Sequence, residues 1–223
     1  MYDPVTGCQS TGGRYISLMT ETTSEPWVQT TPADASVREQ LVAAAGEHFK
    51  RYGYEKTTLA ELANSVGFSK AYFYKFFRSK QEIGEAICSQ CLGRILAVVE
   101  ADVASSKTAT EQLRRFLKKL PEMGSELFFE ERKLYDVAAV SALEQWSSTT
   151  NYLDRLAEIV HNILLSGRES GEFERKTPID EITRAILLAM RPFIDPRVLQ
   201  YHLDFVPEGA NEVVSMILRS LAP

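Results

Sequence analysis

Long apolar runs are absent from this sequence of 223 residues. The longest, such as Ile95 to Val99 and Ala185 to Met190, fall far short of the roughly 18 residues that cross a bilayer. The N-terminal stretch also lacks a basic region followed by an apolar one, so we expect no secretory signal peptide. The sequence therefore predicts a cytoplasmic protein without a membrane span.

Cysteine, histidine, glycine and proline are scarce as well. Three cysteines are an odd number, which argues against a disulfide framework, and 12 glycines with 9 prolines exclude a collagen-like or low-complexity chain. His48, His161 and His202 share no spacing typical of metal ligands, so a structural role is favoured for each. Neither a glycine-rich phosphate loop nor a recognisable Ser, His and Asp set is present. We expect no metal, no cofactor and no enzymatic activity.

Two of the cysteines, Cys88 and Cys91, form a CSQC motif inside an expected helix, which places both thiols on one face. A redox switch and half of a metal site are the functional interpretations. Zinc normally takes four ligands, and no second pair or nearby histidine supplies the others. The sequence therefore favours plain packing of two small side chains.

Charge is distributed unevenly along the chain. The net charge is −5, but residues 35 to 80 hold eight basic and four acidic side chains, which leaves −9 for the rest. A compact basic island in an acidic protein indicates a local anionic partner, and nucleic acid is the first candidate.

Helix start signals punctuate the sequence from Ser36 onward, whereas two-residue alternation is nearly absent. Expected helices run from Ser36 to near Gly53, over about 58–65, from Ser69 to about Phe77 and from Lys80 to about Val103, then over about 109–121, 132–147, 149–170, 178–194 and 209–221. The fold class predicted is all-α. Four of the starts have the capping-box form, and a fifth has proline at the first helical position: Ser36 with Glu39, Thr58 with Glu61, Ser79 with Glu82, Thr108 with Glu111, and Thr177 before Pro178.

Three parts are expected along the chain. Residues 1–34 mix Thr, Ser, Gly and Pro and predict a flexible arm. Residues 35–95 predict a compact N-terminal helical domain, and residues 83–223 a C-terminal helical domain that shares the long fourth helix. The helices at 178–194 and 209–221 are apolar on several faces, which predicts that a second copy of the chain covers them in a homodimer.

Residues 58–77 read TLAELANSVGFSKAYFYKFF, a short helix, a turn at Gly67 and a second helix. This order is typical of a helix-turn-helix motif, whose second helix enters a major groove about 12 Å wide. Phe73 and Phe77 share one face of that helix and are expected to be buried. The helix starts at Thr58 and Ser69 offer backbone amides to phosphate. The outside is left with basic and aromatic side chains: Lys70, Tyr72, Tyr74 and Lys75.

The stretch FKRYGYEKTTLAELANSVGFSKAYFYKFFRSKQEI resembles the DNA-binding domain of tetracycline-repressor (TetR) family regulators, and the resemblance covers about residues 35–95. It implies a homodimeric repressor that releases a near-palindromic double-stranded DNA operator when a small molecule enters the C-terminal domain. It also implies that one set of residues faces DNA: Thr58, Lys70, Ala71, Tyr72, Tyr74, Lys75 and Lys80.

Two positions depart from the family pattern. The family usually has glycine at the third position of the recognition helix, where this chain has Ala71, and often a small hydroxyl residue next, where this chain has Tyr72. The base preference of family members therefore does not transfer to this chain.

The C-terminal half supplies candidates for effector contacts. They favour a mostly apolar, partly aromatic ligand, and the acidic balance favours a neutral or cationic one over an anion. Core packing is the alternative role for the aromatic members. The candidates are Cys91, Ile95, Phe116, Phe128, Tyr135, Trp146, Tyr152 and His161.

Two other functions stay open at this stage. One is a helical enzyme that uses a C-terminal cavity, although no nucleophile, base or metal set is visible. The other is a DNA-binding protein without an effector, which a solidly packed C-terminal domain would favour. The sequence also leaves open whether the regulator represses or activates.

Overall fold

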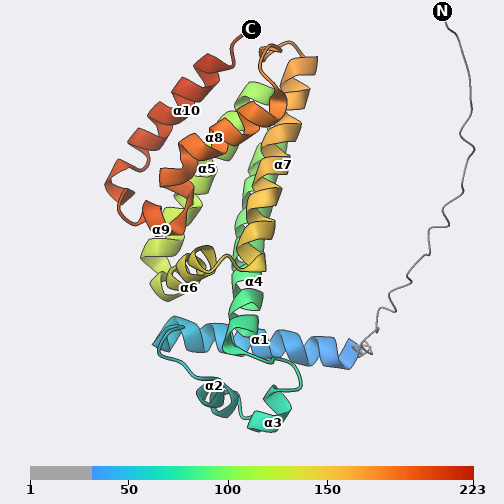
Figure 1. Cartoon of the computed structure of the whole chain (residues 1–223), viewed down its shortest axis with the longest axis vertical. Coiled ribbons are helices and arrows are strands. Elements are labelled where there is room, and N and C mark those ends of the chain that lie inside the picture. Colours follow the sequence, from blue (N-terminus) through green and yellow to red (C-terminus); the bar gives the residue numbers. More distant parts are fainter. Residues whose placement is uncertain (1–31) are drawn as a thin grey trace, which may run out of the picture.

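The computed structural model describes residues 32–223, and in this range it confirms the all-α fold without any strand (Figure 1). The predicted arm lies, up to Thr31, outside the described residues. The helices are α1 (Pro32–Tyr52), α2 (Leu59–Ser65), α3 (Lys70–Phe73), α4 (Lys80–Ala104), α5 (Ala109–Glu130), α6 (Arg132–Leu143), α7 (Ser147–Glu169), α8 (Ile179–Ile194), α9 (Pro196–Leu199), a 3-10 turn (Leu203–Phe205) and α10 (Glu208–Ser220).

The first helix begins earlier than predicted. Pro32 is its first residue, and the acidic Asp34 lies in its first turn. Proline and an acidic side chain both suit a helix start, because the missing amide has no partner there and the helix dipole favours negative charge. Ser36 therefore lies inside α1, so the predicted capping box is wrong, and residues 32–34 of the predicted arm belong to α1.

The fifth helix ends later than predicted. It passes through Pro121, which is buried, and continues to Glu130. A proline removes one backbone hydrogen bond, but the apolar stripe of Leu113, Leu117 and Leu120 extends to Leu127, so packing outweighs that loss. The predicted helix 132–147 ends at Leu143, and the short helix α9 was not predicted.

Two hydrophobic cores are joined by α4. Ile83 and Ile87 of α4 belong to the core formed with α1, α2, α3 and α6, whereas Ile95 and Val99 belong to the core of the C-terminal helices. Figure 1 shows α1 lying across the lower end of α4 with α2 and α3 beneath it, and the remaining helices gathered around the upper part of α4. A shift of α4 would thus displace side chains in the cores of both domains.

The turn after α7 closes onto the start of α5. The Glu172 carboxylate accepts hydrogen bonds from the backbone N–H groups of Ala109 (3.1 Å) and Thr110 (2.9 Å). The hydrogen bond from Thr110 is the main reason that the pKa of Glu172 is lowered to about 2. Glu172 therefore supplies from 62 residues away a cap that α5 needs.

Glu172→Gln is expected to lower the melting temperature at pH 7 by a few degrees, about 1 kcal/mol, because a charged cap is lost. The folded pKa lies below the ordinary value of 4.5, so this stabilisation is present above about pH 4.5 and is lost as the pH falls toward 2. Thermal unfolding at several pH values measures it. Glu169→Gln, an exposed change at the end of α7, is the control. An unchanged difference between wild type and Glu172→Gln at about pH 3 would contradict this assignment.

Candidate DNA-binding surface and effector cavity

The helix α2 begins with a complete capping box, as predicted. The Thr58 hydroxyl accepts from the backbone N–H of Glu61 (3.2 Å), and the Glu61 carboxylate accepts from the backbone N–H of Thr58 (2.7 Å). The hydrogen bond from the Thr58 backbone holds the pKa of Glu61 below its usual range. The start of α2 is therefore locally fixed.

The turn between α2 and α3 passes through Gly67, whose φ of 75° suits glycine. Ser69 then caps α3 by accepting from the backbone N–H of Tyr72 (3.2 Å). Regular α-helix ends at Phe73, earlier than predicted, and hydrogen-bonded turns continue to Phe77. Both Phe73 and Phe77 are fully buried, as predicted.

Seven of the eight predicted DNA contacts are exposed on this motif. The Tyr72 ring lies between Phe68 and Phe76, with centroid separations of 5.0 and 5.3 Å, so it is supported on both sides. The Lys70 ammonium lies 5.8 Å from the Tyr74 ring centroid. The exposed set is Thr58, Ser69, Lys70, Ala71, Tyr72, Tyr74 and Lys75.

Lys75 and Lys80 both contact other parts of the N-terminal domain. Lys75 is exposed and forms an ion pair with Asp34 of α1 (3.2 Å). Lys80 is half-buried, where its ammonium donates to the Tyr54 carbonyl (3.2 Å) and lies 4.3 Å from the Tyr54 ring centroid. Lys80 thus joins the segment before α2 to α4, and its contact with DNA stays a prediction.

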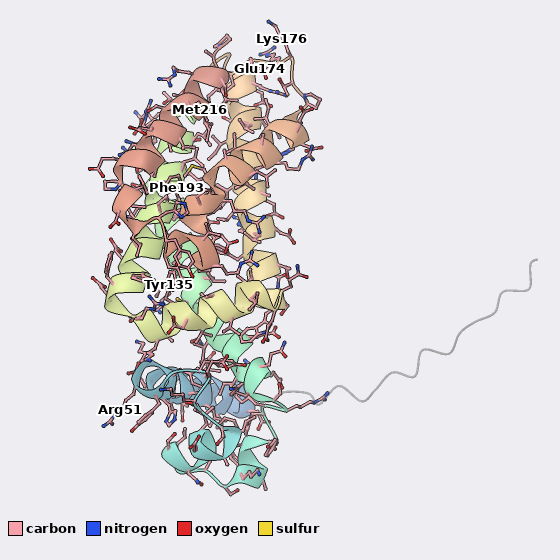
Figure 2. All side chains as sticks on the ribbon, turned by 60° about the vertical axis from the view of Figure 1, so that its left-hand side comes forward. Arg51, Tyr135, Glu174, Lys176, Phe193 and Met216 are labelled. Carbon is pink, nitrogen blue, oxygen red and sulfur yellow. The ribbon has the colours of Figure 1, made fainter. Side chains whose placement is uncertain are left out.

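A cavity of about 1250 Å³ lies among α4, α5, α6, α7, α8 and α9. It exceeds the roughly 300–1,000 Å³ that is typical of sites for drug-sized ligands. Tyr135 lines the cavity from α6, and Figure 2 shows it above Arg51 of α1 and below Phe193 of α8. The lining of the cavity is mixed, and the apolar part includes Leu92, Ile95, Leu120, Leu127, Ala138, Leu187 and Leu199.

The eight predicted effector residues divide evenly. Four line this cavity: Ile95, Tyr135, Tyr152 and His161. The other four lie elsewhere. The pattern of apolar spacing marks buried faces in general and gives no signal that separates cavity from solid core.

Each of those four has another packing role. Phe116 is fully buried in the C-terminal core, and Phe128 packs edge-on against the outer side of Tyr135 with a centroid separation of 5.0 Å. Cys91 borders a smaller groove between α1 and α4. Trp146 packs against Tyr54 at 5.5 Å.

The lining of the cavity also carries charges that the sequence reasoning missed: Asp154, Glu158, Asp180, Asp195, Arg184, Arg191 and Arg197. Asp195 is bound by Arg197 (2.6 Å) and by Arg191 (3.3 Å). Burial tends to raise the pKa of Asp195, but the hydrogen bonds from Arg197 outweigh it and hold this pKa below its usual range. Arg184 lies about two turns before Arg191 on the exposed side of α8. In the sequence, the two arginines seven residues apart on a mostly apolar helix could have indicated these charges.

The cysteines of the CSQC motif are both buried free thiols. Burial raises the pKa of Cys88 and of Cys91, which keeps both in the unreactive thiol form. Within residues 32–223, no group of three or more His, Cys, Asp or Glu side chains could hold a metal ion. No helix in the same range has the length and hydropathy required to span a membrane.

An N-terminal helix-turn-helix domain, joined by one long helix to a helical domain with an internal cavity, defines a ligand-responsive DNA-binding regulator. The family model described as "Bacterial regulatory proteins, tetR family" matches residues 41–87, and "Tetracyclin repressor-like, C-terminal domain" matches residues 109–209. The chain belongs to the TetR family of transcriptional regulators.

Known proteins resemble most of the chain. The "Fatty acid metabolism regulator protein" of Bacillus subtilis (strain 168) is 24% identical over 143 residues, which cover 60% of this chain and 70% of that protein. The structure of the TetR family regulator PfmR from Thermus thermophilus is 26% identical with a TM-score of 0.52 and covers 82% of this chain and 100% of that one. The structure of the regulator FadR from Bacillus subtilis in complex with stearoyl-CoA is 20% identical with a TM-score of 0.59, over 82% and 97% of the two chains.

Proposed function

We propose that this protein is a homodimeric repressor that binds a near-palindromic operator and releases it when a large, mostly apolar effector enters the C-terminal cavity. The observation that carries the proposal is that one chain holds an exposed basic and aromatic surface on α3 and a 1250 Å³ cavity, with α4 contributing to both domains. The rival hypothesis of a DNA-binding protein without an effector loses support, because that hypothesis required a solidly packed C-terminal domain.

In the proposed complex, α3 lies in the major groove. Lys70 and Lys75 contact phosphate or guanine, Tyr72 and Tyr74 reach bases or backbone, and the amides at the starts of α2 and α3 bind phosphate. Two copies related by a two-fold axis would place their α3 segments about 34–36 Å apart, or a multiple of one helical turn.

Lys70→Ala and Lys75→Ala are expected to weaken operator binding and to flatten its salt dependence by about one unit of slope if each contacts phosphate. Tyr72→Ala should alter the preferred sequence more than the salt slope. Selection from random DNA followed by titration at several salt concentrations measures both effects. Lys107→Ala, an exposed lysine at the turn between α4 and α5, is the matched control. If the Lys70, Tyr72 and Lys75 variants all bind the operator like the parent protein, this surface does not face DNA.

Long-chain acyl compounds are the proposed effector class. The cavity is larger than a small aromatic molecule requires, much of its lining is apolar, and Arg184 and Arg191 at the opening suit an anionic head group. The cavity lining holds four carboxylates (Asp154, Glu158, Asp180 and Asp195) and three arginines, so its charge balance alone does not favour an anion. The proposal of an acyl compound rests on the apolar part of the lining and on Arg184 and Arg191. The similarity to a fatty acid metabolism regulator and to a structure with bound stearoyl-CoA agrees with this class.

Palmitoyl-CoA is expected to release the operator, whereas acetyl-CoA is not, because the two share the charged head but only the former fills the apolar part of the cavity. Fluorescence anisotropy of a labelled operator measures the release. Equal release by the two thioesters would rule out the cavity as the site of the acyl chain.

A further inference from the structure

Five side chains with hydroxyl groups line the cavity, and four of these groups are already occupied. The Tyr135 hydroxyl donates to the Pro196 carbonyl (2.6 Å), and the Thr183 hydroxyl donates to the Ile179 carbonyl (2.8 Å). Thr150 donates to the Ser147 carbonyl (3.1 Å), and Thr149 shares a hydrogen bond with Ser141 (2.6 Å). These four groups hold the cavity wall together.

The fifth hydroxyl, that of Tyr152, has no hydrogen-bond partner among residues 32–223. Tyr152 lies on α7 and lines the cavity together with Leu92 and Ile95 of α4. Burial raises the pKa of its hydroxyl well above the ordinary value, so the group is a neutral donor. Tyr152 is half-buried, and its hydroxyl is not sealed from solvent. A ligand that accepts a hydrogen bond from this unpaired donor gains a fixed orientation in the cavity.

The surroundings of Tyr152 select against a charged acceptor. The helices α4, α5 and α6 contribute only uncharged side chains to the cavity lining, α7 itself adds the carboxylates of Asp154 and Glu158, and the arginines come from α8 and α9. A carboxylate placed next to Tyr152 would lose its hydration and gain one neutral donor, which does not compensate. A neutral carbonyl loses much less on burial and can accept the same hydrogen bond.

We propose that Tyr152 recognises the effector by donating a hydrogen bond to an uncharged carbonyl group, of the ketone, ester, thioester or amide type, within the apolar body of the ligand. This inference rests on the proposed function of the cavity. It makes Tyr152 a residue that determines specificity, and it separates two tasks: charge is bound at the opening of the cavity, and a neutral acceptor is bound inside it.

Three matched probes test the inference on the full-length protein: 1-phenyldecan-1-one, decylbenzene and 4-decylbenzoic acid. Their affinities are measured by displacement of the fluorescent apolar reporter N-phenyl-1-naphthylamine. Tyr152→Phe is expected to weaken binding of the ketone about tenfold and to leave the hydrocarbon within about twofold. The acid can place its carboxylate at Arg184 and Arg191, away from Tyr152, so Tyr152→Phe is expected to leave its affinity within about twofold.

Tyr135→Phe is the matched control, because its hydroxyl lines the same cavity but already donates to Pro196. This variant is expected to keep the parental ratio of ketone to hydrocarbon affinity. An unchanged ratio in Tyr152→Phe, or an equal loss of affinity for the ketone and the acid in this variant, would overturn the inference. If palmitoyl-CoA still releases the operator in that case, the proposed function stands without it. If neither palmitoyl-CoA nor any of the probes binds, the proposed function fails and the inference falls with it.

Discussion

Leu188→Asp and Met216→Asp are each expected to convert the protein from a dimer to a monomer of about 25.1 kDa. The two side chains are 58% and 53% exposed on α8 and α10, whose opposite faces are buried in the C-terminal core through Ile186 and Val214. Leu188 also borders the cavity, whereas Met216 does not, so Met216→Asp tests the interface without changing the effector site. Figure 2 labels Met216 at the end of the molecule that is far from Arg51 of α1. Large apolar side chains exposed on two packed helices fit a four-helix bundle with a second copy, where a new carboxylate would be buried without a partner.

Light scattering at micromolar concentration measures this change, and operator titration measures its consequence. A monomer contacts one half-site at a time, so operator affinity should fall roughly a hundredfold or more. Leu143→Asp is the matched control, because Leu143 is 69% exposed on α6 and should leave the dimer intact. Leu218 is unsuitable for the test because it is half-buried against the core. A dimeric mass for both α8 and α10 variants would exclude this face as the interface.

The helix-turn-helix motif could be predicted closely because its signals are local. The cap at Thr58 requires only Glu61 three residues on, and the turn at Gly67 requires only a positive φ. The burial of Phe73 and Phe77 follows from their helical spacing. Such features survive in almost any tertiary context, so sequence reasoning found them.

The cavity could not be delimited in the same way, because it depends on how six elements from distant parts of the chain meet. Ile95 and Phe116 are both apolar residues on amphipathic helices, yet one lines the cavity and the other is sealed in the core. The contact between Lys80 and the Tyr54 carbonyl could not be predicted for the same reason, since the two residues are 26 positions apart. Pro121 shows tertiary packing overriding a local stop signal.

Gly84→Ala is expected to weaken operator binding about tenfold and to uncouple it from the effector, because Gly84 allows a close contact between the two domains. A Cβ atom at this position would lie 2.9 Å from the Tyr54 ring and 3.0 Å from the Trp146 ring. Both rings are bulky parts of a closely packed core, so the methyl group would force them apart. Overpacking of this kind lowers stability by about 1–3 kcal/mol, and here it would disturb the contact between the domains.

This contact lies between the cavity and the DNA-binding motif. Gln145, which lines the cavity with a φ of 54°, directly precedes Trp146, and Trp146 packs on Tyr54. The carbonyl of Tyr54 in turn binds Lys80 at the start of α4. A ligand that displaces the corner between α6 and α7 would therefore move the segment that leads into α2.

Thermodynamic linkage makes the expected result measurable. An effector that weakens operator binding a hundredfold must itself bind the operator complex a hundredfold more weakly, a coupling of about 2.7 kcal/mol. Titrating palmitoyl-CoA into free and operator-bound protein gives this ratio, which should fall toward one in Gly84→Ala. Gly93→Ala on the same helix is the control, because a Cβ there meets nothing within 4 Å. A parental ratio in Gly84→Ala, at parental operator affinity, would show that the signal between the domains bypasses Tyr54 and Trp146.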